Sequence, residues 1–322
     1  MKGQISSIAK RIFFSLILPV CMYAFLCIVN PGNFMHFKTF IMMFTQCLPY
    51  VAIGWSMLFG MSVGLFDFSA GARIVLSGLG GILLSQSYGL WGFALGCLIV
   101  NIILSIIVGA TYSYLKIPSI IAGFAGLLIF ESCSVIIVKQ MKNTISSQNL
   151  ILGKSPYIYI FITIIFLITY FVYNNTKFGY QIKAIGGNEH VARSMGINSG
   201  RLKLLTYIIG GVFLGAATII YVSYAGTVQP KDGMSSMNLC FTPMMGVMIG
   251  QLLTSCNPVI GTFIGELCIT MVSSGMVALG IESRLQNVLV GTFLIIFMAF
   301  QINKNSDFVK KLTRKKTAVP AQ

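Results

Sequence analysis

The sequence has few charged residues for its length, and acidic side chains are the rarest of them. Only 9% of its 322 residues are charged, and Asp and Glu together number 7 against 22 Lys and Arg. A soluble domain carries about 25% charged residues, whereas 56% of this chain is hydrophobic. The composition therefore excludes an ordinary soluble protein and predicts a chain that lies mostly in lipid.

Motifs for metal binding, hydrolysis and nucleotide binding are missing from the sequence. Histidine occurs twice, and the eight cysteines are scattered without a CxxC or Cys/His spacing, so we interpret them as small apolar side chains. Gly153-Lys154-Ser155 resembles the end of a P-loop, but Gln148 stands where that motif needs a glycine. We predict a protein that is not an enzyme, with no metal, no cofactor and no ATP site of its own.

Apolar stretches long enough to cross a membrane recur along the chain. A spanning helix needs about 20 mostly apolar residues, which predicts segments at 12–30, 39–64, 69–86, 90–115, 118–138, 157–173, 204–226, 240–252, 257–278 and 284–301. The third and the eighth are short and rich in Gly, Ser, Thr and Pro, and they hold matching places in two four-span groups that enter the membrane from opposite faces. We predict an all-α integral membrane protein of about ten transmembrane helices, with two inverted halves in one transmembrane domain over 1–322.

The basic residues are distributed unevenly between the predicted loops. With a cytoplasmic N-terminus, most of the 22 Lys and Arg lie in cytoplasmic loops and tails, as the positive-inside rule requires. We therefore expect a multi-pass protein with both termini in the cytoplasm and a basic tail, 302–322, that contacts membrane lipid. The basic residues form no patch with interleaved aromatics, so nucleic acid is not an expected partner.

The longest polar stretch, 177–203, has the pattern of a short helix between two spans. Asn188 is a favourable N-cap, Glu189 follows in the first turn, and Gly196 can end the helix. One apolar face would hold Val191, Ala192 and Met195. We predict an amphipathic helix that lies outside the bilayer and presses against another protein.

Acidic residues inside predicted spans need an explanation, because a charge at the bilayer centre costs about 2.5–3.5 kcal/mol. Glu131 either lines a solute pathway or dimer interface, or lies near the outer end of its span in partial contact with water. Glu266 is a second pathway candidate. Asp67 and Arg73 either pair across a tight cytoplasmic turn or contact a solute. Two membrane acids, Glu131 and Glu266, also leave open an ion-coupled secondary transporter.

Three motifs carry a likeness to a known family. They are GLFDFSAGARIVLSG, with Asp67, Ser69 and Gly71 in matching places, KIPSIIAGFAGLLIF, and the long and specific FGYQIKAIGGNEHVARSMGINSGRLKLLTY. Through them the chain resembles, over almost its whole length, the permease subunits of ribose-type sugar ABC importers, in the wider group that includes branched-chain amino acid permeases.

This resemblance implies a ten-span permease of the bacterial plasma membrane that imports a sugar or related small polar solute. It would work as a homodimer, or as a heterodimer with a second permease, and an extracytoplasmic binding protein would deliver the solute. Cytoplasmic ABC ATPases would bind the ATP and contact the short helix as a coupling helix, at Asn188, Glu189, Ala192, Arg193, Gly196 and Ile197. The candidates for the pathway or dimer interface are Asp67, Ser69, Glu131 and Glu266.

Overall fold

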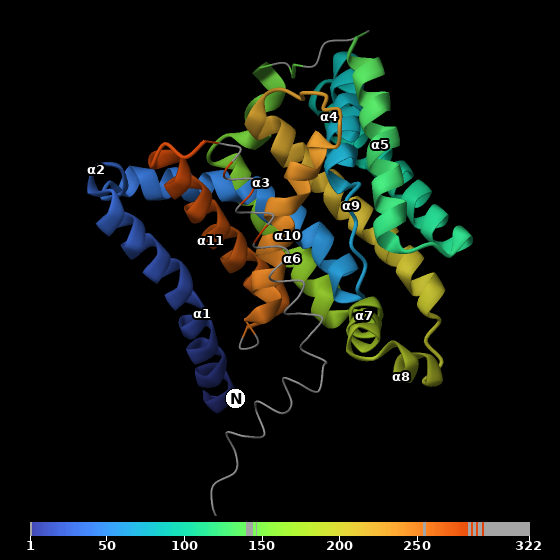
Figure 1. Ribbon diagram of the computed structural model, residues 1–322, viewed down its shortest axis with the longest axis horizontal. Coiled ribbons are helices and arrows are strands. Elements are labelled where there is room, and N and C mark those ends of the chain that lie inside the picture. The colour runs from blue at the N-terminus through green and yellow to red at the C-terminus, as the bar shows by residue number, and fades with distance from the viewer. Residues whose placement is uncertain are drawn as a thin grey trace, which may run out of the picture. The chain divides into compact units, whose positions relative to one another are not determined.

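The computed structural model is helical over nearly all the residues it describes, which are 2–139, 144, 145, 147–253, 256–282, 285, 288 and 292 (Figure 1). The chain divides into two compact units, Met1–Gly275 and Met276–Gln322, and the features below belong to the first. The helices in chain order are α1 (Lys2–Val29), α2 (Pro31–Phe34), α3 (Phe37–Ser62), α4 (Ala70–Leu115), α5 (Ser119–Val138), η1 (Ser147–Gly153), α6 (Tyr157–Asn175), α7 (Lys177–Gly187), α8 (Glu189–Ser194), α9 (Ser199–Ala225), η2 (Ser235–Met237), α10 (Asn238–Leu252) and α11 (Pro258–Ala278).

Six helices in the described part of the chain are long and apolar enough to cross a membrane, namely α3, α4, α5, α6, α9 and α11. In α1 the apolar stretch Leu16–Val29 is shorter, and α10 has only 15 residues. The expected segment 284–301 lies outside the described residues except for three positions. The expectation of an all-helical membrane protein is therefore confirmed, while the count of ten spans stays a prediction.

Helix α4 consists of two antiparallel arms that meet at Gly89. This glycine has φ 57° and ψ −140°, a conformation that interrupts the helix and turns the chain back. The arms 70–88 and 90–115 pack closely, because a β-carbon on Gly81 would lie 2.4 Å from the Sγ atom of Cys97. The two segments expected here thus occur as the arms of one hairpin.

The core of the first unit forms where α9 packs against α3 and α4. On the α3 side, the rings of Phe59 and Phe213 have centroids 5.0 Å apart, and Trp55 Nε1 donates a hydrogen bond of 2.9 Å to the carbonyl oxygen of Val259 in α11. On the α4 side, a buried cluster includes Val75, Leu79, Phe93, Cys97, Ile219 and Val222. Large apolar side chains remain exposed on the outer faces of α4, α5 and α6, as lipid contact requires.

Helices α10 and α11 touch through glycines. A β-carbon on Gly265 would lie 2.1 Å from the carbonyl oxygen of Gly246, and one on Gly250 would lie 2.4 Å from the carbonyl carbon of Gly261. The two GxxxG pairs of these helices therefore face each other, which brings their backbones into direct contact. Such close packing stabilises helix pairs in lipid, where apolar burial between helices contributes little.

Substitution of Gly265 by alanine tests this contact. Gly265→Ala is expected to lower the free energy of unfolding by about 1–3 kcal/mol, because its methyl group has to displace the α10 backbone. The control is Gly60→Ala in α3, where the nearest atom to the added carbon lies 3.5 Å away and the gain in helix propensity is about 0.5–1 kcal/mol. Thermal unfolding in detergent measures both variants, and equal midpoints would contradict the α10–α11 contact.

Candidate functional site

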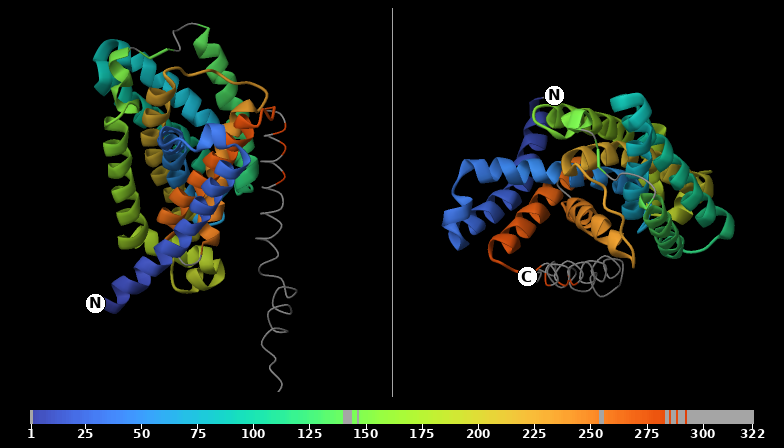
Figure 2. Two further views of the ribbon diagram at one scale, coloured as in Figure 1. Left: turned by 90° about the vertical axis from the view of Figure 1, so that its left-hand side faces the viewer. Right: turned by 90° about the horizontal axis from the view of Figure 1, so that it is seen from above.

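The polar stretch 177–203 folds as α7, α8 and the first turn of α9, and it lies at one end of the first unit (Figures 1 and 2). We call this the α8 end. From it α9 runs through the unit to the opposite end (Figure 1). The sequence predicted only the short helix that α8 forms. Helix α7 was missed, although Thr176 caps it by accepting a hydrogen bond from the backbone N–H of Gly179 at 3.2 Å.

Helix α8 begins and ends at the residues that the sequence predicted. The side-chain oxygen of Asn188 accepts hydrogen bonds from the backbone N–H groups of His190 at 3.0 Å and Val191 at 3.2 Å. After the helix, Gly196 has φ +83°, and the backbone N–H of Ile197 donates to the carbonyl oxygen of Ala192 at 3.1 Å. Both ends thus have the hydrogen-bond pattern of a capped helix.

Glu189 fastens α8 to α9. Its Oε1 atom accepts hydrogen bonds from Arg193 Nη2 at 2.7 Å and from Ser199 Oγ at 2.8 Å. Its Oε2 atom lies 3.0 Å from Lys203 Nζ, an ion pair with the second turn of α9. The Ser199 hydroxyl, together with Lys203 and Arg193, lowers the pKa of Glu189 to about 2. A single carboxylate therefore holds two helices in a fixed relation.

The exposed face of α8 differs from the one expected. Ala192 is only 2% exposed and packs inward, whereas Val191 is 54% and Met195 66% exposed. The three were predicted on one face, but the helix turns its middle residue toward the protein and leaves the i and i+4 pair outside. A partner that docks on α8 would meet Val191 and Met195 rather than Ala192.

Helix α7 is anchored to α6 by Lys183. The Nζ atom of Lys183 donates a hydrogen bond of 2.9 Å to Asn174 Oδ1 and lies 4.4 Å from the centre of the Tyr173 ring. The same amide oxygen accepts a bond of 2.9 Å from Asn257 Nδ2. Burial lowers the pKa of Lys183, because desolvation disfavours its charged form. Lys183 therefore holds α7 against α6 by contacts with two uncharged side chains, Asn174 and Tyr173.

The C-terminal end of α7 presses on the end of α3. A β-carbon on Gly186 would lie 2.0 Å from the carbonyl oxygen of Ser62, the last residue of α3, whereas one on Gly187 would meet no atom within 4 Å. Only a glycine fits at Gly186. The segment that follows α3 leads directly to Asp67, so this contact joins the α8 end to the second group of candidate residues.

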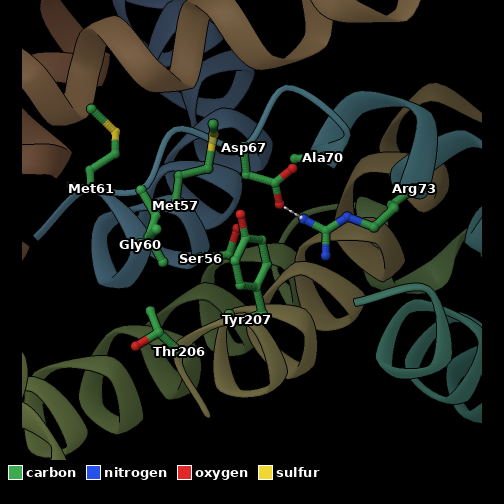
Figure 3. A pocket seen from close by; sticks show the side chains of 11 residues that line it. Ser56, Met57, Gly60, Met61, Asp67, Ala70, Arg73, Thr206 and Tyr207 are labelled. Carbon is green, nitrogen blue, oxygen red and sulfur yellow. Dashed lines mark hydrogen bonds and ion pairs between the residues drawn. The ribbon is translucent and has the colours of Figure 1, made fainter. Parts of the chain in front are cut away.

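Asp67 forms the expected ion pair with Arg73 at the start of α4 (Figure 3). Its Oδ1 atom also accepts hydrogen bonds from the backbone N–H of Ser69 at 3.0 Å and from the Ser69 hydroxyl at 2.6 Å. Arg73 donates a second hydrogen bond to the hydroxyl of Ser105. These contacts hold the segment 63–69 against the first turn of α4.

A pocket opens beside this ion pair, and we call it the Asp67 pocket. It is lined by α3, by Asp67, Ala70 and Arg73, and by Thr206 and Tyr207 of α9. Figure 3 shows the Tyr207 ring pointing from α9 toward Ser56 and the Asp67 segment. Within the described residues, the Tyr207 hydroxyl and Arg73 Nε are buried without a hydrogen-bond partner. Two of the residues that line the pocket thus each hold a buried polar atom without a described partner.

The remaining two acids lie apart from this pocket. Glu131 of α5 is 3% exposed and accepts hydrogen bonds from the backbone N–H groups of Met234 at 2.8 Å and Ser236 at 2.7 Å. Glu266 is fully buried against Gly54 and Gly246, and neither of its oxygens has a partner among the described residues. The four candidates for the pathway or dimer interface thus lie at three separate places in the fold: Asp67 with Ser69, Glu131, and Glu266.

The partners of Glu189 and Glu131 were missed from the sequence. Ser199 and Lys203 lie 10 and 14 residues from Glu189, and Ser236 lies 105 residues from Glu131. No motif marks these pairs. The only available signal was the rarity of acidic residues, each of which needs a donor or a cation when it is buried.

The contact between α7 and α3 predicts opposite effects for two adjacent glycines. Gly186→Ala is expected to lower the free energy of unfolding by about 1–3 kcal/mol, since the methyl group displaces α7 from Ser62. Gly187→Ala is expected to be neutral or slightly stabilising, because its site is open and alanine favours a helix. Thermal unfolding of the two purified variants measures the difference, and a result in which Gly187→Ala is the more damaging would contradict the contact.

The lowered pKa of Glu189 predicts a pH dependence. Because the folded pKa of about 2 lies below the ordinary value of 4.5, the stabilisation is complete above about pH 4.5 and is lost as the pH falls toward 2. Unfolding midpoints of the wild type and Glu189→Gln should therefore differ at pH 6 and converge on acidification through this range. A difference that stays constant with pH would show that the charge of Glu189 does not stabilise the fold.

Comparison with known proteins identifies the family of this chain. The chain matches the family described as branched-chain amino acid transport system / permease component over residues 39–298. It is similar to the autoinducer 2 import system permease protein LsrC of Salmonella typhi, with 25% identity over 321 residues, 94% of this chain and 89% of the relative. LsrC of Yersinia pseudotuberculosis serotype O:1b is 23% identical over 298 residues, 89% of this chain and 83% of the relative.

No solved structure matches the chain. The family match nevertheless covers most of its length, and the curated relatives are similar over nearly all of it. The chain therefore belongs to the branched-chain amino acid transport system permease family, as a permease of the ribose-type ABC importers.

Proposed function

We propose that this protein is the membrane-spanning subunit of an ATP-driven importer that carries a sugar-like polar solute across the bacterial plasma membrane. Partner ABC ATPases bind and hydrolyse the ATP, an extracytoplasmic binding protein delivers the solute, and a second permease, identical or related, completes the assembly. The chain contributes ten spans in two inverted halves, with both termini in the cytoplasm. Because its relatives are named for autoinducer 2 import, that compound is the first solute to test.

The observation that carries this proposal is the attachment of α8 to α9 by Glu189. An ATPase docked on Val191 and Met195 would move α8, and the contacts of Glu189 with Ser199 and Lys203 would transmit that movement to α9. Helix α9 reaches the Asp67 pocket with Thr206 and Tyr207. Movement of a rigid helix is a common way to switch a binding site between two faces of a protein.

The charge of the α8 end supports a cytoplasmic location. The stretch 177–203 carries Lys177, Lys183, Arg193, Arg201 and Lys203, and basic loops between spans stay on the cytoplasmic side. A cytoplasmic ATPase, which uses cytoplasmic ATP, would therefore be on the same side of the membrane as the α8 end. The family match also favours ATP-driven import over ion-coupled transport through Glu131 and Glu266.

Purification with partners tests the proposal. The isolated permease is expected to hydrolyse no ATP, whereas the protein drawn from its native membrane should bring a P-loop ATPase with it and take up solute in vesicles supplied with ATP. Glu189→Ala should reduce ATP-dependent uptake by at least tenfold while the protein still inserts, because α8 is released from α9. Arg201→Ala is the control, since its exposed side chain lies in the first turn of α9, outside the Glu189 contacts.

Two results would overturn the proposal. One is the failure to recover any ATPase, combined with uptake that survives Glu189→Ala. The other is uptake that a protonophore abolishes while ATP remains at its normal level, which would show ion-coupled transport instead.

A further inference from the structure

Two helices, α4 and α10, begin at the same place inside the first unit. Helix α4 starts after the segment 63–69, and α10 starts after η2. The backbone N–H of Gly71 donates a hydrogen bond of 2.8 Å to Cys240 Sγ, and the Cys240 thiol lies 3.6 Å from the carbonyl oxygen of Phe68. A β-carbon on Gly71 would lie 2.1 Å from the carbonyl oxygen of Ser236. We call this direct contact between the two helix starts the helix junction.

The helix junction brings two positive helix ends together, and two carboxylates offset their repulsion. The first turn of a helix has free N–H groups and a partial positive charge. Asp67 accepts two hydrogen bonds from Ser69 on the α4 side. On the α10 side Glu131 accepts bonds from the backbone N–H groups of Met234 and Ser236, and a third from the Ser236 hydroxyl.

The two carboxylates are placed differently. Asp67 lies two residues before Ser69, the N-cap of α4, and accepts a hydrogen bond from its backbone N–H. Glu131 lies on α5 and reaches a segment more than 100 residues further along the chain. The position of η2 and of the α10 start therefore depends on a side chain from another helix. Loss of the Glu131 contacts would release the α10 half of the helix junction and leave the α4 half intact.

A pocket lies on each side of the helix junction. The Asp67 pocket reaches Ala70 and Arg73. A second pocket, which we call the Lys231 pocket, is lined by residues that include Ile74, Val75, Tyr221, Lys231 and Leu239. On α9 the Asp67 pocket includes Tyr207 and the Lys231 pocket includes Tyr221, which at 1.5 Å per residue are about 21 Å apart along the helix.

The part of α9 between the two pockets is closely packed. Gly211 meets Ser105, Gly215 meets Leu98, and Leu214 is 1% exposed. Along α9, this packing against the 90–115 arm of α4 therefore separates the part that lines the Asp67 pocket from the part that lines the Lys231 pocket. The helix junction borders both pockets, since Ala70 beside Gly71 lines the Asp67 pocket and Leu239 beside Cys240 lines the Lys231 pocket, while Cys240 itself is fully buried.

We propose that the helix junction is the closed barrier between the two pockets, and that Glu131 is the positioning residue that keeps it closed. This inference rests on the proposed transport function. Movement of α9 by the docked ATPase separates the starts of α4 and α10, and the two pockets then join. The barrier is a contact between backbones rather than a plug of large side chains, so a small shift is enough to open it.

Cys240 is a native probe of this barrier. The experiment uses the complete importer, with its ATPases, in lipid vesicles exposed to N-ethylmaleimide with and without Mg-ATP, and mass spectrometry of the cysteine peptides. Labelling of Cys240 should rise at least tenfold during ATP turnover. Cys97 is the internal control, because it is equally buried but lies in the hairpin of α4, and it should remain unlabelled in both conditions.

Two matched substitutions test Glu131. Glu131→Gln keeps the size of the side chain but replaces one acceptor oxygen by an NH₂ group that faces N–H donors. Because hydrogen bonds to a carboxylate are stronger than those to an amide, labelling of Cys240 without ATP should increase at least tenfold, and coupled uptake should fall. Glu266→Gln makes the same change at a buried acid that has no described donor, and it should leave the Cys240 labelling rate unchanged.

The outcomes separate this inference from the proposed function. If the wild-type importer takes up solute with ATP but Cys240 stays as unreactive as Cys97, the helix junction is not the barrier and the transport function stands. Equal labelling rates of Cys240 in Glu131→Gln and Glu266→Gln would show that Glu131 does not keep the helix junction closed. If the wild-type complex shows no ATP-dependent uptake, the proposed function fails and this inference fails with it. Should Glu131→Gln not insert into the membrane, the comparison of Cys240 with Cys97 in the wild type still decides whether the barrier opens.

Discussion

Several helices of this protein begin inside the bundle, and their free backbone N–H groups need hydrogen-bond acceptors. A helix that begins inside an apolar bundle has N–H groups that no water reaches, and each unsatisfied group costs free energy. The chain has seven acidic residues, and three of them serve helix starts. Asp67 accepts from the start of α4, Glu131 from η2 before α10, and Glu189 joins α8 to the first turns of α9. Two of the few acidic residues thus accept from backbone N–H groups at helix starts, and a third joins two helices through side-chain contacts.

Glycines allow the helices to approach each other closely. At the α10–α11 contact, at Gly186 beside Ser62 and at Gly71 beside Ser236, a β-carbon would lie within 2.5 Å of a backbone atom of the neighbour. Backbone contacts of this kind allow little adjustment by side-chain rotation. A displacement of one helix has to move its neighbour or open the contact, which is the mechanical property that a transport subunit needs.

Local features of the chain could be predicted well from the sequence. Asn188 and Gly196 flank α8, and Asp67 pairs with Arg73 six residues away, so each prediction involved neighbours in the chain. The apolar face of α8 was predicted less well, because helical spacing places Ala192 near Val191 but does not say which of the two faces the protein. Helix α7 was missed because it contains three glycines, which disfavour a helix, and because its anchor, Lys183, finds its partners on α6.

The sequence by itself determined the membrane class, the position of the exposed polar stretch and the caps of its helix, because composition and interactions between nearby residues decide these properties. Only the tertiary structure decided that Glu131 holds the α10 start, that Cys240 lies between two helix starts, and that adjacent Gly186 and Gly187 have opposite surroundings. These depend on which distant segments meet. In a chain where most residues are apolar, many pairings bury similar surface, so hydrophobicity alone does not select among them; close backbone contacts and buried hydrogen bonds do.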